Sequence, residues 1–317
     1  MKLDKLLTGL ILAFSFLFIF LLVFYGIVLW NQTERLFFAA LEGEKNFLES
    51  SLNTSTLNSS PPPSLSPQLI LNLPPLELSA RSAAIVQVFS DNKEKIWFKK
   101  NNNLKLPIAS LTKLMTAVIV LENYNLNDEI VISKEALSQD ERREFLEEGK
   151  KMRVSDLLYL MIITSSNKAA YALSEGMDKS NFLYLMNQKA HELNMYDTFF
   201  VDVTGLSPDN VSTVDDLIRL ARYILANHFD IISISNKKEY EIPGYGKIVN
   251  TNELLDQIDN IILGKTGLTE EAKGCLILIL NRNNEGYFIY VLLGSDDRFS
   301  EMKKMINWVD LIKQKEY

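Results

Sequence analysis

Three short polar motifs follow one another along this 317-residue chain, and a fold must bring them together if they serve one site. They are Ser110-Leu-Thr-Lys113, Ser165-Ser-Asn167 and Lys265-Thr-Gly267. Each is weak evidence alone, since Ser-x-x-Lys also begins at four other serines of the chain. The stronger evidence is their order along the chain and the sequence around them.

The first motif predicts a nucleophile and its base. We expect a helix from Ser110 to about Asn123, which places Lys113 three residues on and on the same face, within reach of the serine hydroxyl. Serine becomes a good nucleophile when a base removes its proton, and a lysine can do so if burial and nearby cations keep it neutral. The alternative is an ordinary helix cap, a serine followed by an exposed lysine.

The other two motifs lie at predicted element boundaries. Apolar spacing from Ser155 to Glu175 predicts two helical pieces that meet at residues 164–166, where a polar helix junction is the alternative interpretation. Lys265-Thr-Gly267 follows an apolar run and precedes two more, Gly274–Leu280 and Tyr287–Leu293. These runs predict three antiparallel strands, although Lys-Thr-Gly alone is also compatible with a simple turn.

The remaining pattern completes an α+β head. Residues 83–89 and 95–99 predict a hairpin. We therefore predict an antiparallel sheet packed against helices, with an all-helical insertion between Ser110 and about Asn236. A content of 47% hydrophobic and 23% charged residues is sufficient for a full-sized core.

The N-terminal part predicts a membrane anchor and a tether. Residues 9–30 carry no charge, and at 1.5 Å per residue they would form about 33 Å of helix, enough to span a bilayer. We favour an uncleaved anchor over a cleaved signal peptide, with Lys2 and Lys5 placing the N-terminus in the cytoplasm and the rest outside. The predicted organisation is a cytoplasmic tip and transmembrane helix at 1–30, a stalk and Ser/Pro/Asn-rich linker at 31–80, and a catalytic domain at 81–317.

Composition excludes several function classes. A net charge of −7 without a basic stripe argues against nucleic-acid binding. The single cysteine, Cys275, stands in an apolar run, which predicts a buried structural thiol. Neither of the two histidines belongs to a His-Glu-x-x-His pattern, so a zinc peptidase is not expected, and no metal or organic cofactor is implied.

The sequence around each motif resembles the serine D-Ala-D-Ala carboxypeptidases, the low-molecular-weight penicillin-binding proteins, over roughly residues 82–308. The matching stretches are Leu106–Ala117, Asp156–Ala170 and Gly264–Thr269. The resemblance implies a DD-peptidase/β-lactamase-like fold. It also implies a membrane-anchored enzyme that removes the terminal D-Ala from peptidoglycan stem peptides, with β-lactams as covalent inhibitors.

The same resemblance implies a role for each motif residue. Ser110 would form the acyl-enzyme, with Lys113 as base, and Ser165 would relay the proton to the leaving amine. The backbone N–H groups of Ser110 and Leu268 would form the oxyanion hole. Substrate contacts would come from a set of four residues: Asn167 for a substrate amide, Lys265 and Thr266 for the terminal carboxylate, and Gly267 for close approach of the peptide.

One position departs from the family pattern, and three alternatives stay open. Ser166 stands where we expect Gly in many relatives, and it would add a hydroxymethyl group near the cleft.

An endopeptidase that cuts peptidoglycan crosslinks is a close variant of the carboxypeptidase. A class A β-lactamase would need Glu-x-x-Leu-Asn between the second and third motifs, where it does not occur. A non-catalytic peptidoglycan- or penicillin-binding module would be expected to have lost a motif residue.

Overall fold

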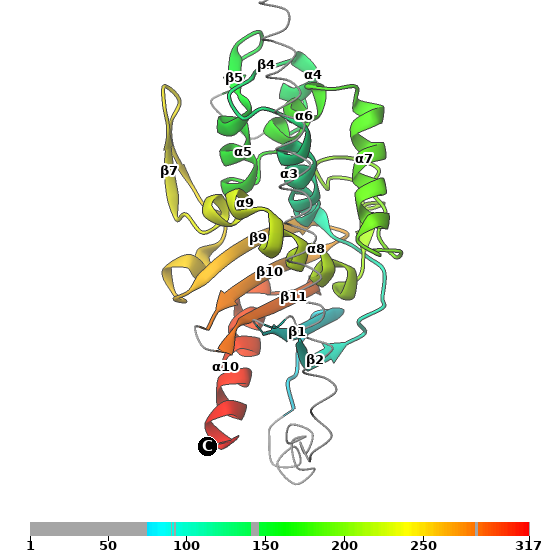
Figure 1. The fold of residues 1–317 in the computed structure, drawn as a ribbon, viewed down its shortest axis with the longest axis vertical. Helices are drawn as coiled ribbons and strands as arrows, with labels where there is room; N and C mark the ends of the chain where they lie inside the picture. Colours follow the sequence, from blue (N-terminus) through cyan, green and yellow to red (C-terminus); the bar gives the residue numbers. More distant parts are fainter. Residues whose placement is uncertain (1–74, 90, 92, 141–145, 283–284, 317) are drawn as a thin grey trace, which may run out of the picture. The chain divides into compact units, whose positions relative to one another are not determined.

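A five-stranded sheet, in the order β2-β1-β11-β10-β9, is packed between helices (Figure 1). All neighbouring strands are antiparallel. Their bounds are β1 (Ser82–Val88), β2 (Glu94–Lys100), β9 (Ile261–Thr269), β10 (Lys273–Asn281) and β11 (Tyr287–Ser295). The predicted hairpin and the three predicted C-terminal strands are all present, so the expected α+β class is confirmed.

This computed structural model describes residues 75–89, 91, 93–140, 146–282 and 285–316. They belong to one unit, Pro74–Tyr317. Along these stretches no helix combines the length and apolarity needed to cross a bilayer. The predicted span at 9–30 and most of the predicted linker lie outside the described residues.

Helices cover both faces of the sheet. On one face lies α10 (Arg298–Glu316), and on the other lie α8 (Val214–Asn227) and α9 (Phe229–Ser235) (Figure 1). The 3-10 helix η2 (Glu253–Asp256) directly precedes β9. The other helices form the layer above: η1 (Ala109–Leu111), α3 (Thr112–Asn123), α4 (Lys134–Leu137), α5 (Val154–Ile163), α6 (Asn167–Glu175) and α7 (Lys179–Glu192).

The alternation of side chains along β10 explains why a hydrophobic core lies on each face of the sheet. Cys275, Ile277 and Ile279 belong to the core shared with the helical layer, whereas Leu276 and Leu278 belong to the core under α10. Successive side chains of a strand point to opposite faces, so a continuous apolar run is buried on both. Cys275 is a free, fully buried thiol, as predicted, and burial raises its pKa to about 11.

Short strand pairs were missed by the sequence analysis. The predicted helical insertion is mainly helical, but it contains β4 (Glu129–Val131) paired with β5 (Lys151–Arg153) and also β6 (Val211–Ser212), which pairs with β3 (Leu106–Pro107). A projecting hairpin, β7 (Glu239–Ile242) and β8 (Gly246–Val249), precedes β9. These strands are two to four residues long, too short for an alternating pattern to emerge.

Candidate active site

Ser110 lies in the 3-10 turn η1, directly ahead of α3. The Nζ atom of Lys113 lies 3.0 Å from the Oγ atom of Ser110. Lys113 is fully buried, and α3 is capped at Leu111 without any side-chain hydrogen bond. The helix-cap interpretation of this motif is therefore wrong, and the geometry is that of a hydroxyl paired with a buried amine.

Two more oxygens surround the amine of Lys113. The Oδ1 atom of Asn167 and the backbone carbonyl of Thr204 each lie 2.6 Å from Nζ. Asn167 opens α6, and Thr204 stands in the loop between α7 and α8. Three separated segments thus hold the lysine in place beside the serine.

Ser165 occupies the junction between α5 and α6. Its backbone adopts a left-handed conformation, with φ of 61°. The Nζ atom of Lys265 donates to the Oγ atom of Ser165 at 2.8 Å and to the Thr266 carbonyl at 3.1 Å. The second and third motifs therefore meet directly, and Lys265 is only 1% exposed.

Ser166 was expected near the cleft, but its side chain is not part of the cleft wall. It is fully buried, and its hydroxyl accepts a hydrogen bond of 3.0 Å from the backbone N–H of Ala169. Ser166 is the N-cap residue of α6. The hydroxymethyl group that departs from the family pattern is a helix cap, and its contact explains why this position takes a serine.

A cleft of about 360 Å³ opens above these groups. The predicted residues on its wall are Ser110, Ser165, Asn167, Thr266, Gly267 and Leu268. Lys113 and Lys265 are not on the wall but lie buried beside it. Among the described residues, no group of His, Cys, Asp or Glu side chains is arranged to hold a metal ion.

Four polar residues of the cleft wall were not predicted as site residues: Asp140, Thr251, Thr269 and Arg298. Thr251 bonds Thr266, with 2.7 Å between their hydroxyl oxygens. Arg298 begins α10, and burial lowers the pKa of its guanidinium. None of these residues belongs to one of the three motifs, although Thr251 and Arg298 lie in stretches that resemble the family sequence.

Among the described residues that line the cleft, Arg298 is the one with a cationic side chain. Its Nε atom is buried and has no hydrogen-bond partner among the described residues. A buried donor without an acceptor is unfavourable, and a guanidinium binds carboxylates with two parallel hydrogen bonds. The arrangement therefore suits an anionic ligand group in the cleft.

Gly267 brings the edge of β9 against the segment that carries the nucleophile. A Cβ atom at this position would lie 3.1 Å from the Ile108 carbonyl oxygen and 3.2 Å from the Ser110 nitrogen. The glycine thus allows close packing within the protein, in addition to its expected role toward substrate. It also places the Ser110 nitrogen beside the strand that continues to Leu268, and the oxyanion hole formed by these two N–H groups stays a prediction.

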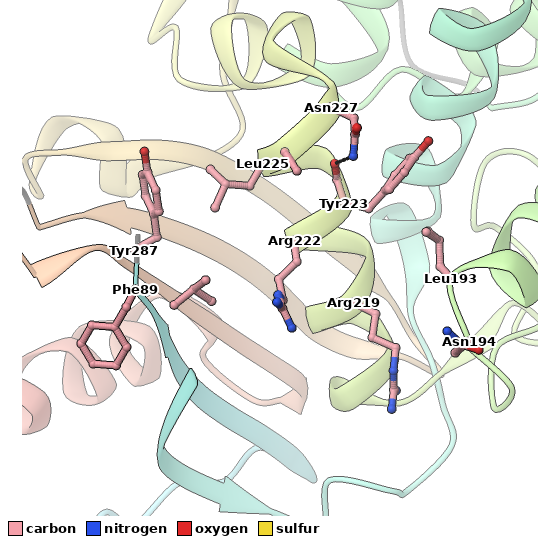
Figure 2. Close-up of a pocket in the computed structure, with 11 residues that line it drawn as sticks. Phe89, Leu193, Asn194, Arg219, Arg222, Tyr223, Leu225, Asn227 and Tyr287 are labelled. Atoms are coloured by element: carbon pink, nitrogen blue, oxygen red, sulfur yellow. Dashed lines mark hydrogen bonds between the residues drawn. The ribbon is translucent and has the colours of Figure 1, made fainter. Parts of the chain in front are cut away.

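A second, larger hollow lies elsewhere and contains no motif residue. It measures about 670 Å³ and is lined by α8, the residues after α7 and the ends of β1 and β11 (Figure 2). Its two arginines are already paired, Arg219 with Asp216 at 2.7 Å and Arg222 with Glu94. With these charges paired and none of the three motifs among its described lining residues, the hollow is not the candidate active site.

Comparison with known proteins agrees with this geometry. Residues 70–297 match the family model described as D-alanyl-D-alanine carboxypeptidase. A D-alanyl-D-alanine endopeptidase of Pseudomonas aeruginosa is 32% identical over 277 residues, which cover 83% of this chain and 86% of that protein. The D-alanyl-D-alanine carboxypeptidase DacF of Bacillus subtilis is 29% identical and covers 72% of this chain, with 61% of its own length matched.

Solved structures show the same architecture. Penicillin-binding protein D2 of Listeria monocytogenes in its ampicillin-bound form superposes with a TM-score of 0.64 at 29% identity, over 74% of this chain and 99% of that chain. A mutant of the Streptomyces K15 DD-transpeptidase gives a TM-score of 0.67 at 26% identity, over 73% of this chain and 98% of that chain.

Proposed function

The chain belongs to the D-alanyl-D-alanine carboxypeptidase family of peptidases, and on that premise we propose that it is a serine D-Ala-D-Ala carboxypeptidase acting on peptidoglycan stem peptides. The observation that carries the proposal is the 3.0 Å hydrogen bond between the fully buried Lys113 amine and the Ser110 hydroxyl. A non-catalytic binding module would have no use for this pair.

The proposed reaction proceeds through an acyl-enzyme. Neutral Lys113 takes the proton of Ser110 while Oγ attacks the carbonyl carbon of the penultimate D-Ala. The N–H groups of Ser110 and Leu268 stabilise the oxyanion. Ser165 passes the proton to the leaving amine, the C–N bond breaks, and D-Ala departs. Water then attacks the ester, which releases the shortened peptide and restores the Ser110 hydroxyl.

The carboxylate of the departing residue is the group we assign to the Arg298 side of the cleft. Arg298 and the Thr266 hydroxyl both belong to the cleft wall. Lys265 contributes its charge from beside the cleft, since its ammonium donates to Ser165. A carboxylate would give the Arg298 guanidinium an acceptor and neutralise a partly desolvated cation.

Endopeptidase activity is the second candidate, and it is favoured by the relative from Pseudomonas aeruginosa, which is named an endopeptidase. A D-amino acid that is crosslinked through its α-amine keeps its own carboxylate, as terminal D-Ala does. The same carboxylate contact therefore suits both substrates. The side chain that the leaving residue carries would decide between them.

We also propose that residues 9–30 anchor the enzyme in the cell membrane, with the N-terminus cytoplasmic and the catalytic domain outside. The support is the charge-free sequence of these 22 residues with lysines ahead of it. Protease treatment of intact cells should remove the catalytic domain, and fractionation should find the chain with membranes. Recovery of the chain in the soluble fraction would contradict the anchor.

The decisive experiment uses the full chain and three proteins: wild type, Ser110→Ala, and Ser180→Ala as an exposed-serine control. Wild type and the control should bind fluorescent penicillin covalently, and Ser110→Ala should not. Mass spectrometry would then follow two substrates, a stem peptide ending in D-Ala-D-Ala and a crosslinked muropeptide dimer. Release of D-Ala supports the carboxypeptidase, and dimer cleavage supports the endopeptidase. A folded wild type that takes no label and cleaves neither would overturn the proposal.

A further inference from the structure

Asp140 is a carboxylate on the cleft wall that the proposed reaction does not use. It follows α4, and its Oδ2 atom accepts a hydrogen bond of 2.8 Å from the Nδ2 atom of Asn167. The Nζ atom of Lys168 lies 4.0 Å from its other oxygen. The side chain of Asp140 is 16% exposed, so this contact is largely sheltered from water.

The contact fixes which way the Asn167 amide faces. An amide has a donating NH₂ end and an accepting oxygen end, whereas an ionised carboxylate only accepts. Asp140 therefore binds the NH₂ end, and the oxygen end must face Lys113, where the distance is 2.6 Å. One amide hydrogen remains for a substrate oxygen.

This orientation matters because Lys113 must keep a lone pair for Ser110. A neutral amine has two N–H bonds and one lone pair. The Asn167 oxygen and the Thr204 carbonyl both accept from Nζ, which matches the two N–H bonds. The lone pair is then available to the Ser110 hydroxyl 3.0 Å away.

A reversed amide would disturb this arrangement. Its NH₂ end would face Lys113 and could donate to the lone pair, so the amine would no longer be directed at Ser110. The oxygen end would face Asp140, where two acceptors repel each other. The carboxylate thus makes the reversed state unfavourable in the resting enzyme.

We propose that Asp140 is a positioning residue, which holds the Asn167 amide so that the lone pair of Lys113 points to Ser110. The proposal rests on the proposed function, because it assigns Lys113 the role of base. Asp140 acts through Asn167 and touches neither the serine nor the bond that breaks.

A double-mutant cycle on the full chain tests this route. The proteins are wild type, Asp140→Ala, Asn167→Ala, the double variant, Asp140→Asn, and Glu148→Ala as a control that removes an exposed carboxylate from the same connection between α4 and β5. Stopped-flow labelling with fluorescent penicillin gives the acylation rate constant and the noncovalent dissociation constant separately. Thermal unfolding checks that each variant is folded.

We expect Asp140→Ala to lower the acylation rate constant about tenfold to a hundredfold while the noncovalent constant changes little. In the Asn167→Ala background the same change should have no further effect, because the residue it acts through is absent. Asp140→Asn should fall between wild type and Asp140→Ala, since its oxygen can still accept but its NH₂ no longer excludes the reversed amide. Glu148→Ala should match wild type.

Two results would overturn the role of Asp140 and leave the proposed function intact. One is an acylation rate constant for Asp140→Ala equal to that of Glu148→Ala. The other is an equal loss of rate from Asp140→Ala in the wild-type and Asn167→Ala backgrounds. A wild type that neither takes penicillin nor cleaves either peptide would overturn the proposed function and this inference together. The cases are distinguishable because only the last one involves an inactive wild type.

Discussion

Lys265 donates a hydrogen bond of 2.8 Å to the hydroxyl of Ser165, so the lysine of the third motif serves the serine of the second. An ammonium group only donates, which makes the Ser165 oxygen the acceptor. In the proposed reaction the Ser165 hydroxyl in turn donates its hydrogen to the amine that departs. The contact joins the second and third motifs in one site.

Replacement of Lys265 by methionine is expected to slow acylation about a hundredfold, because Ser165, the proposed proton relay, would lose the ammonium group that donates to it. The hydroxyl of Ser165 would lose the contact that orients it, and the site would lose a positive charge. Penicillin labelling rates would measure the effect. Lys304→Met, which removes an exposed lysine of α10, should leave the rate unchanged; an equal loss in both would contradict the assigned role.

Gly205 and Gly149 form a matched pair for testing the segment before the nucleophile. Both have positive φ, 83° and 75°, but a Cβ atom at Gly205 would lie 1.9 Å from the Ala109 carbonyl oxygen, whereas one at Gly149 meets nothing within 4 Å. Gly149→Ala should cost about 1 kcal/mol of unfolding free energy from backbone strain alone. Gly205→Ala should cost more and also slow acylation, because Ser110 must move. Urea unfolding and penicillin labelling would show whether the two variants differ.

The cap at Ser166 predicts an order of stabilities. Ser166→Ala should lower the unfolding free energy by about 1 kcal/mol, because the Ala169 N–H loses its acceptor inside the protein. Ser166→Gly should lower it by only a few tenths of that, because glycine adopts the N-cap backbone more readily than alanine. Urea unfolding of both variants gives the comparison. An alanine variant as stable as wild type would show that the hydroxyl does not act as a cap.

Glu122 predicts a specific loss of stability in acid. Burial disfavours its charge, but hydrogen bonds from Tyr223 and Lys189, together with the charges of Lys189 and His228, outweigh burial and hold its pKa below the ordinary 4.5. A lowered carboxyl pKa stabilises the fold above the ordinary value, and the contribution is lost as the pH falls through the folded-state pKa.

The variant Glu122→Gln should therefore cost about 0.5 kcal/mol at pH 7, a small value because the carboxylate is partly exposed. The difference from wild type should shrink at pH 3, where the carboxyl of wild type is becoming protonated too. Urea unfolding of both proteins at the two pH values would measure it. A difference that is independent of pH would mean that Glu122 stabilises α3 through packing instead of charge.

The sheet was predictable because its strands are long apolar runs separated by turn residues. The pairing of Ser110 with Lys113 was also predictable, since helical spacing fixes it locally. Asp140 and Arg298 were not, because both lie outside the three motifs and only the tertiary fold places them on the cleft wall. The side chain of Ser166 was misassigned because its direction depends on the left-handed backbone of Ser165, which the sequence does not reveal.

The partners of the Lys113 amine, Asn167 and Thr204, lie 54 and 91 residues away along the chain. A molecule in which either contact has not formed carries a serine without a competent base. Covalent labelling would therefore count only the molecules whose tertiary structure is complete. During refolding, covalent penicillin labelling should recover later than the helical circular dichroism signal. The rate of labelling would therefore report when the tertiary contacts around Lys113 have formed.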